Sequence, residues 1–238
     1  MKRNMFSIVI RTYNEEKWIG SVLEAIRNQK YKEYEVIIVD SNSTDKTIEI
    51  CKKYNCRIIT IDKSRFNYSY ASNIGAENAK GDILCYLSGH SVPVNSDYLE
   101  KANELFNDRN IGGVYGEVIA LPDGSFIEKI FNNLGYKKSL NRGRIYEKDI
   151  HPGILSCSNA MLRREIWEKH KFKEALGHGG EDVEMAYRII NDNFWIVKAP
   201  ELLVKHSHGS SLIKFINEFK GWRKMYKDVE KYIYQYKE

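Results

Sequence analysis

The sequence has few cysteines and no long apolar run, and each shortage excludes a class of protein. Its four cysteines are too scattered for a disulfide scaffold or a zinc ribbon, so we expect reduced thiols. No segment approaches the roughly 20 apolar residues of a membrane span. The apolar stretch before Arg11 is also too short for a secretory signal. These absences predict a cytoplasmic protein, and they leave open peripheral binding to the inner face of the cell membrane.

Extremes of composition and charge are missing as well. Only 16 glycines and 4 prolines occur among 238 residues, and 42% of the chain is hydrophobic, which excludes collagen-like and disordered proteins. The 37 basic and 32 acidic residues give a net charge of +5. Basic and acidic side chains are mixed along most of the chain, so we expect no nucleic-acid partner, although the mild excess suits an anionic ligand.

The first third alternates between two kinds of apolar pattern. Short β-branched runs typical of buried strands occur at residues 6–10, 35–40, 57–61 and 82–87. Segments with helical spacing lie between them, at residues 14–26, 43–54 and 71–79. This order predicts an α/β fold with a mostly parallel, doubly wound sheet flanked by helices. Ligands of such sheets bind beyond the carboxyl ends of the strands.

The second half is less regular. Strands are expected at residues 113–121, 154–157 and 195–204, and helices are expected to begin at residues 164 and 181. The basic stretch at 137–144 is interpreted as a mobile loop that either closes over a ligand or is simply solvated. Since no linker or repeat is visible, we predict one domain over residues 1–211, followed by a helical appendage at 212–238.

A glycine-rich turn after the first strand is absent. The first glycine is Gly20, inside the first predicted helix, which excludes the dinucleotide fingerprint and the P-loop. Polar residues follow the first two strands instead. They are Thr12, Tyr13, Glu15, Asp40 and Ser41. A carboxylate there can accept a hydrogen bond from a base or a ribose, and Tyr13 can stack on a base. For any one of these residues alone, a helix cap or turn is the simpler interpretation.

Residues 7–15 and 36–45 resemble the opening of family 2 glycosyltransferases with the GT-A fold. The resemblance continues through residues 71–76, 79–83, 158–161 and 180–184, and it covers nearly the whole chain up to about residue 211. It implies a Rossmann-like GT-A domain and an inverting transfer of a sugar. The donor would be a UDP- or dTDP-sugar, and the acceptor a hydroxyl of a glycan or a lipid-linked molecule. Residues 88–93 look most similar to rhamnosyltransferase-like members.

The resemblance also implies roles for individual residues. Donor binding falls to Thr12, Tyr13, Glu15, Asp40, Ser41, Arg65, Asn73 and Ser88, and acceptor binding to Ser158 and Asn159. Asp182 would be the general base, with Glu181 as its neighbour, because an inverting transfer needs a carboxylate to take the acceptor proton. The alternative for this acidic pair is a first helical turn favoured by the helix dipole.

One family motif is missing. The fourth strand lacks the usual Asp-x-Asp metal motif, and His90 falls where its metal-ligating carboxylate is expected. His206 and His208 follow the last predicted strand, so three imidazoles are candidate ligands for Mn²⁺, or less favourably for Mg²⁺. The alternatives are unrelated surface histidines, or protein cations in place of a metal.

The missing motif also keeps open a non-catalytic nucleotide-sugar-binding or scaffold protein. A sugar nucleotidyltransferase is a further alternative.

The segment from residue 212 to 238 is amphipathic. Apolar residues recur there at three- and four-residue steps, and seven basic side chains accompany four acidic ones. The apolar stripe is expected either to pack on the domain or on a second copy in a homodimer, or to lie on an anionic membrane surface.

Overall fold

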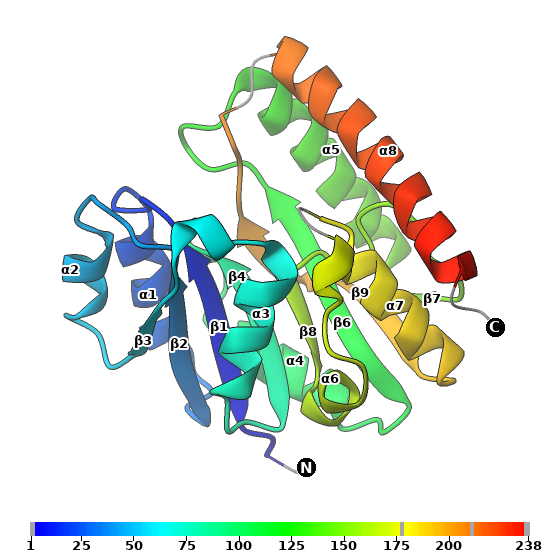
Figure 1. Ribbon diagram of the computed structural model, residues 1–238, viewed down its shortest axis with the longest axis horizontal. Coiled ribbons are helices and arrows are strands. Elements are labelled where there is room, and N and C mark those ends of the chain that lie inside the picture. The colour runs from blue at the N-terminus through cyan, green and yellow to red at the C-terminus, as the bar shows by residue number, and fades with distance from the viewer. Residues whose placement is uncertain (1–2, 177–178, 210–211, 236–238) are drawn as a thin grey trace.

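One nine-stranded sheet forms the centre of the computed structural model, which describes residues 3–176, 179–209 and 212–235 (Figure 1). The strands are β1 (Phe6–Thr12), β2 (Tyr34–Asp40), β3 (Arg57–Thr60), β4 (Ile83–Ser88), β5 (Val92–Pro93), β6 (Ile111–Ile119), β7 (Ile145–Glu147), β8 (Asn159–Arg163) and β9 (Trp195–Lys205). The α-helices are α1 (Ile19–Arg27), α2 (Thr47–Cys51), α3 (Tyr68–Glu77), α4 (Tyr98–Phe106), α5 (Phe126–Arg142), α6 (Arg164–His170), α7 (Glu181–Asn191) and α8 (Leu212–Gln235). Short 3-10 turns lie at Lys63–Arg65 and Glu174–Leu176.

Most strands point the same way, and this places their carboxyl ends at one edge. The strand order is β3-β2-β1-β4-β8-β6-β9-β5, with β7 beside β9. The pairs β1–β2, β2–β3, β1–β4 and β6–β9 are parallel. Because β8 is antiparallel to both β4 and β6, these two strands share a direction. The sheet is therefore mostly parallel, with β5, β7 and β8 antiparallel to the other strands, and β1, β2, β3, β4, β6 and β9 all end at the same edge.

Helices cover both faces of the sheet. Phe6, Ile8 and Ile10 point to a core formed with α1 and α4, whereas Val9 points to a second core formed with α3, α6, α7 and α8. This alternation along β1 is the period-two pattern of a strand buried on both faces. The four strands predicted in the first third are confirmed, and so are the predicted α/β class and the helices between these strands.

Two predictions for the second half are wrong. Residues 154–157 form a turn rather than a strand, and β8 begins only at Asn159. Ile154, Leu155 and Cys157 are buried, so the apolar run mimics a strand, but Leu155 has a φ of 53°, which breaks an extended chain.

The expected mobile loop at residues 137–144 is a second error, because residues up to Arg142 belong to α5. A capping box starts this helix: the Ser125 side chain accepts from the Glu128 N–H, and the Glu128 carboxylate accepts from the Ser125 N–H. Gly143 follows its last residue with a φ of 70°. The apolar periodicity of a packed helix is weak here because α5 leaves most of its surface exposed.

The last described helix is partly built into the domain. Val229 and Ile233 of α8 are buried in the core beneath α7, and the Tyr226 hydroxyl donates to the carbonyl of Ile150. The predicted amphipathic helix therefore uses its second half for packing on the domain. The side chains of residues 212, 213, 215, 216 and 219, which carry much of the predicted stripe, lie outside the described part of the chain. No helix among the described residues is both long and apolar enough to cross a bilayer.

A break in the β6–β9 register shapes the carboxyl edge. Gly116 pairs with Ala199, but Val118 pairs with Val204, so β9 bulges between these positions. The bulged carbonyl oxygen of Leu202 lies 1.5 Å from the place that a Cβ on residue 116 would occupy, so only glycine fits. Asn159 fixes the bulge by donating to the carbonyl oxygens of Leu202, at 2.8 Å, and Glu117, at 3.0 Å.

We expect Gly116→Ala to lower the free energy of unfolding by more than about 2 kcal/mol, because the added methyl group collides with backbone. Urea denaturation measures the change. Gly135→Ala is the matched control: nothing lies within 4 Å of its added Cβ inside α5, and it should stabilise the protein by about 0.5–1 kcal/mol. Equal midpoints for the wild type and Gly116→Ala would contradict this account of the bulge.

Candidate active site

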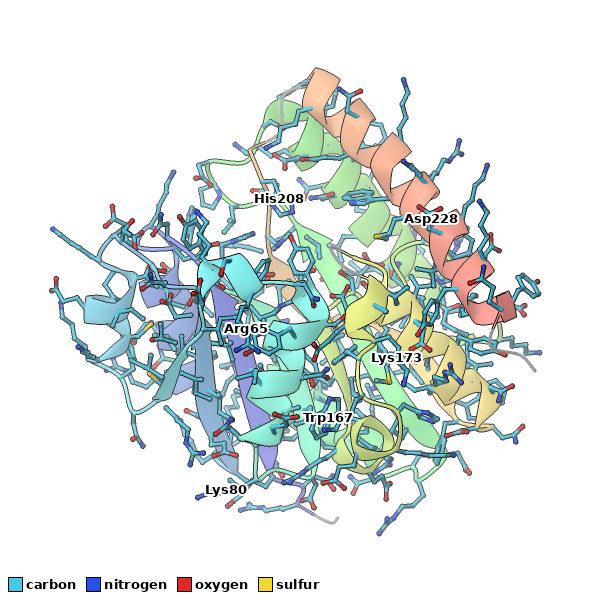
Figure 2. All side chains as sticks on the ribbon, viewed as in Figure 1. Arg65, Lys80, Trp167, Lys173, His208 and Asp228 are labelled. Carbon is cyan, nitrogen blue, oxygen red and sulfur yellow. The ribbon has the colours of Figure 1, made fainter. Side chains whose placement is uncertain are left out.

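The segments that follow the parallel strands, together with the turn before β8 and the start of α7, meet at one edge of the sheet. Figure 2 shows Arg65 and His208 toward this edge, whereas Lys80 and Trp167 lie toward the opposite end of the strands. Most of the residues that the sequence analysis selected therefore share one edge, as expected for a doubly wound sheet.

The loops after β1 and β2 interlock through their polar side chains. Asn14 and Asn42 adopt left-handed conformations, with φ of 53° and 62°, which asparagine tolerates better than most residues. The Asn14 N–H donates to the Ser43 hydroxyl, and the Asn14 side-chain oxygen accepts from the Thr44 N–H. The two predicted donor-binding segments are thereby held against each other.

Asp40 lies at the centre of these interlocked loops and is almost fully buried. Its Oδ1 accepts from the Thr12 hydroxyl at 3.0 Å and from the Ser43 hydroxyl, and its Oδ2 accepts from the Ser43 N–H at 2.8 Å. One Oδ2 lone pair remains for a ligand. The buried hydroxyl of Ser41 has no hydrogen-bond partner in the described structure, so it can also serve a ligand.

Tyr13 lies at the open side of this pocket. It is exposed, its hydroxyl accepts from Lys63 Nζ at 2.6 Å, and the same ammonium lies 4.1 Å from the ring centroid. Arg65 is exposed on the same short 3-10 turn, with its guanidinium 4.8 Å from the ring of Tyr70. The exposed Tyr13 ring, with Lys63 beside it and Arg65 on the neighbouring turn, suits a nucleotide, whose base stacks and whose phosphates are anionic.

The site has two halves: the loops after β1, β2 and β3, and the turn before β8 with the start of α7. Arg11, near the end of β1, connects them. Its guanidinium contacts Glu181 Oε1, the hydroxyl of Ser72 and the carbonyl of Cys157, each at 3.3 Å. Both members of the Arg11–Glu181 ion pair are nearly buried. The sequence analysis assigned no role to Arg11, although a charged residue at the end of an otherwise apolar strand was a usable signal.

Asp182 is the second residue of α7, which begins at Glu181 after Gly180, whose φ is 91°. Burial, and then the charge of Glu181, raise the pKa of Asp182 to about 8, against the opposing effects of the Val183 N–H and Arg11. An acidic turn that only stabilised the helix dipole would keep its charge at neutral pH. Asp182 is instead poised to exchange a proton near neutral pH, which suits a general base.

His90, His206 and His208 form a cluster at the ends of β4 and β9. Their ligand atoms all lie within 4.8 Å of one another, and the His90 and His206 rings stack with centroids 4.5 Å apart. Burial, and then the neighbouring His90, lower the pKa values of His206 and His208. The three histidines that the sequence analysis proposed as metal ligands thus lie together in the structure.

Glu15 contacts this cluster rather than the nucleoside pocket. Its Oε1 lies 2.7 Å from His90 Nδ1, and Gly89 leaves the space, since a Cβ there would come within 2.7 Å of Glu15 Cγ. A proton on Nδ1 leaves Nε2 of His90 with a lone pair, and this buried Nε2 has no partner in the described structure. A carboxylate behind a ligating histidine is a common arrangement in metal sites, so the residues fit a transition-metal ion.

The turn before β8 lines a pocket of about 240 Å³ between β6 and α5. Ser156 and Ser158 share a hydrogen bond of 3.1 Å at its wall. The Glu117–Lys198 ion pair, at 2.7 Å, lies at the same pocket. This pocket adjoins Arg11 and its ion pair with Glu181, because the carbonyl of Cys157, between the two serines, contacts Arg11.

Two predicted binding residues are occupied by internal contacts. The Asn73 amide accepts from Trp167 Nε1 and the Phe172 N–H, and it donates to the Phe172 carbonyl and Glu174. Asn159 accepts from the Tyr98 hydroxyl at 2.7 Å in addition to fixing the bulge. Both side-chain amides hold neighbouring backbone segments in place. The amide of Asn73 uses all its hydrogen-bonding groups in these contacts, so none is left for a nucleotide-sugar. Ser88 ends β4, half-buried, next to Gly89.

Comparisons with known proteins agree with this geometry. A family model described as glycosyl transferase family 2 matches residues 7–171. The O-antigen chain rhamnosyltransferase WbaN of Salmonella anatum is 30% identical over 215 residues, which are 85% of this chain and 66% of that protein. The dolichyl N-acetyl-alpha-D-glucosaminyl phosphate 3-beta-D-2,3-diacetamido-2,3-dideoxy-beta-D-glucuronosyltransferase of Methanococcus voltae is 28% identical, and the match covers 90% of this chain and 70% of that protein. The chain thus spans about two thirds of these relatives.

Solved structures share the fold. The mannosyltransferase PcManGT from Pyrobaculum calidifontis, in complex with GDP-Man and Mn²⁺, matches with a TM-score of 0.66 and 21% identity over 87% of this chain and 58% of that one. S. aureus TarS 1-349 in complex with UDP-GlcNAc matches with a TM-score of 0.65 and 17% identity over 87% and 59%. These likenesses confirm the predicted GT-A fold.

The raised pKa of Asp182 predicts a pH-dependent cost in stability. Between about pH 4 and pH 8 the folded protein keeps a proton that the unfolded chain releases, so stability falls as pH rises through this window. Asp182→Asn removes that dependence. Thermal denaturation measures the difference: the melting temperature of Asp182→Asn should equal that of the wild type near pH 4 and exceed it by several °C at pH 9.

Asp62→Asn provides a control of opposite sign. Hydrogen bonds from the Ser64 N–H and hydroxyl lower the pKa of Asp62, so replacing its carboxylate should destabilise the protein above that pKa rather than stabilise it. A melting temperature of Asp182→Asn that tracks the wild type at every pH would contradict the raised pKa.

Proposed function

The chain belongs to glycosyl transferase family 2, and from this premise we propose that it is an inverting glycosyltransferase. It moves a sugar from a nucleoside-diphosphate donor to a hydroxyl of a glycan or lipid-linked acceptor. The observation that carries the proposal is the half-buried carboxyl group of Asp182, with its pKa of about 8, at the sheet edge that also carries the pocket around Asp40.

The donor binds across the loops after β1, β2 and β3. Tyr13 stacks on the base, while the free lone pair of Asp40 and the hydroxyl of Ser41 bind the base or the ribose. Lys63 and Arg65 supply positive charge at the rim. The buried Asp40 carboxylate can accept a hydrogen bond from the imide N–H of a pyrimidine base, so we favour a UDP- or dTDP-sugar as the donor. Two relatives named as rhamnosyltransferases make rhamnose the first sugar to test.

The chemical step needs a base on the acceptor side. Asp182 takes the proton of the acceptor hydroxyl as that oxygen attacks the anomeric carbon, and the bond from this carbon to the diphosphate oxygen breaks on the opposite side with its electron pair. Ser156 and Ser158 hold the acceptor in the adjoining pocket. Glu181 keeps Arg11 in place and raises the basicity of Asp182.

The histidine cluster is the proposed metal site. Nε2 of His90, together with His206 and His208, would hold a divalent ion, which stabilises the negative charge of the departing diphosphate when bound. Three imidazoles favour Mn²⁺ over Mg²⁺, since Mg²⁺ prefers oxygen ligands. Glu15 fixes the His90 tautomer from behind.

We further propose that the protein works in the cytoplasm, at the inner face of the cell membrane, where lipid-linked acceptors are available. The predicted contact of residues 212–238 with a membrane, or with a second copy of the chain, falls largely on side chains outside the described part. The described second half of α8 is used for packing on α7.

Asp182→Asn should reduce the rate of sugar transfer by about 10²–10⁴-fold, because the amide cannot take a proton. Donor affinity, measured by calorimetry, should stay within about twofold, since Asp182 lies outside the loops assigned to the donor. Asp192→Asn makes the same change at the far end of α7 and should leave transfer unaffected.

Retained transfer by Asp182→Asn would exclude it as the base. A wild-type protein that binds nucleotide sugars yet never releases nucleoside diphosphate would instead be a non-catalytic binder, the rival that the missing Asp-x-Asp motif favours. Release of inorganic diphosphate from a nucleoside triphosphate would identify a nucleotidyltransferase.

Glu15→Gln should weaken Mn²⁺ binding by about 10–100-fold, because the amide no longer favours the proton on His90 Nδ1. The affinity is measured on the free protein by the electron paramagnetic resonance signal of unbound Mn²⁺. Glu16→Gln is the control, since the Glu16 carboxylate only accepts from the Lys46 N–H at the surface. Equal Mn²⁺ affinities for the two variants, or no Mn²⁺ binding by the wild type, would reject this site.

A further inference from the structure

Helix α5 exposes a row of large apolar side chains. Phe126, Ile130 and Leu134 follow one another at four-residue steps and therefore lie on one face of the helix. Their exposed fractions are 80%, 40% and 54%. Three neighbouring apolar side chains with such exposure form a patch, and patches of this kind mark contact surfaces rather than ordinary protein exterior.

The same face becomes basic toward the end of the helix. Lys137 and Lys138 follow Leu134 by three and four residues, and Arg142 follows Lys138 by four. All three are exposed, and no acidic partner is recorded for them among the described residues. The one acidic residue of α5, Glu128, is buried in its capping box. A helix with an exposed apolar row and unopposed positive charge has the composition of an interfacial helix on anionic lipid.

The apolar row borders the pocket assigned to the acceptor. Phe131, which follows Ile130, lines that pocket and is itself half exposed. Asn132 and Gly135 of the same helix line it too, opposite Ser156 and Ser158. One helix thus carries both an apolar outer surface and a wall of a polar pocket, as an acceptor with a lipid tail and a polar head requires.

We propose that α5 is a membrane-docking helix that lies on an anionic bilayer and presents the pocket at Ser156 and Ser158 to the polar head of a lipid-linked acceptor. The acceptor part of this inference rests on the proposed function, whereas the docking part stands on the surface of α5 alone. The apolar row enters the headgroup region, and the Lys and Arg side chains contact the lipid phosphates.

Charge favours a bilayer over a second copy of this chain. In a symmetric dimer with parallel α5 helices, Lys137, Lys138 and Arg142 of one copy would face the same cations of the other. In an antiparallel pair these cations would face the partner's apolar row, which offers no opposite charge. An acidic lipid surface instead offers opposite charge along the whole helix.

Flotation of the full chain with vesicles tests the proposal. The wild type should bind phosphatidylcholine vesicles that contain phosphatidylglycerol and bind pure phosphatidylcholine poorly. Replacing Phe126, Ile130 and Leu134 together by serine should reduce the bound fraction by about tenfold or more, because three buried apolar contacts are lost. Lys137→Glu with Lys138→Glu should abolish the preference for phosphatidylglycerol. Lys30→Glu with Lys52→Glu makes the same charge change on exposed residues near α1 and β3 and should bind like the wild type.

The readouts separate this proposal from the proposed function. Release of nucleoside diphosphate from the donor without vesicles should be unchanged in the serine variant, since its three residues do not line the pocket. Absent donor turnover in a wild type that floats would reject the proposed function and leave docking intact. A wild type that does not float, or a serine variant that floats equally, would overturn docking by α5. Docking by α5 would also be overturned if the wild type forms a dimer and the three serine changes abolish it, because the apolar row of α5 would then belong to a contact with a second copy.

Discussion

The buried ion pair between Arg11 and Glu181 is the interaction on which the site depends. Arg11 lies near the end of β1, in the half proposed to bind the donor, and Glu181 begins α7, in the half proposed to carry the base. Because Arg11 also contacts Ser72 and the Cys157 carbonyl, one guanidinium joins β1, α3, the turn before β8 and α7. A buried cation with these partners is costly to leave unpaired, so the halves are held in one arrangement. The same pair places two opposing charges beside Asp182, whose pKa is raised first by burial and then by Glu181 and is lowered by Arg11.

The direction of the strands explains why distant residues converge. The loops after β1, β2 and β4 form the pocket proposed for the nucleoside and one side of the histidine cluster, while the loop after β9 brings in His206 and His208. The antiparallel β8 brings the turn at 153–158 to the same edge from its other end. The bulge at Gly116 and Asn159 shapes the pocket wall there. The proposed donor, metal and acceptor sites are therefore all arranged by one sheet.

Sequence reasoning succeeded where the pattern was local. The strands of the first third follow from β-branched runs, and the position of His90 near His206 and His208 follows from strand ends that meet at one edge. It failed where tertiary contacts decide. The turn at 154–157 is buried like a strand, and exposed α5 lacks the periodicity of a packed helix. Glu15 contacts His90, and Asn73 contacts the segment around Phe172; neither partner is visible in the spacing of residues.

The central claim is that the carboxyl group of Asp182 must lose its proton before it can accept that of the acceptor hydroxyl. The direct measurement is the pH dependence of transfer under single-turnover conditions with saturating donor. The rate should rise about tenfold per pH unit below the pKa and level off above about pH 8. A rate that is already constant from pH 6 to pH 9, or that falls across this range, would contradict the claim.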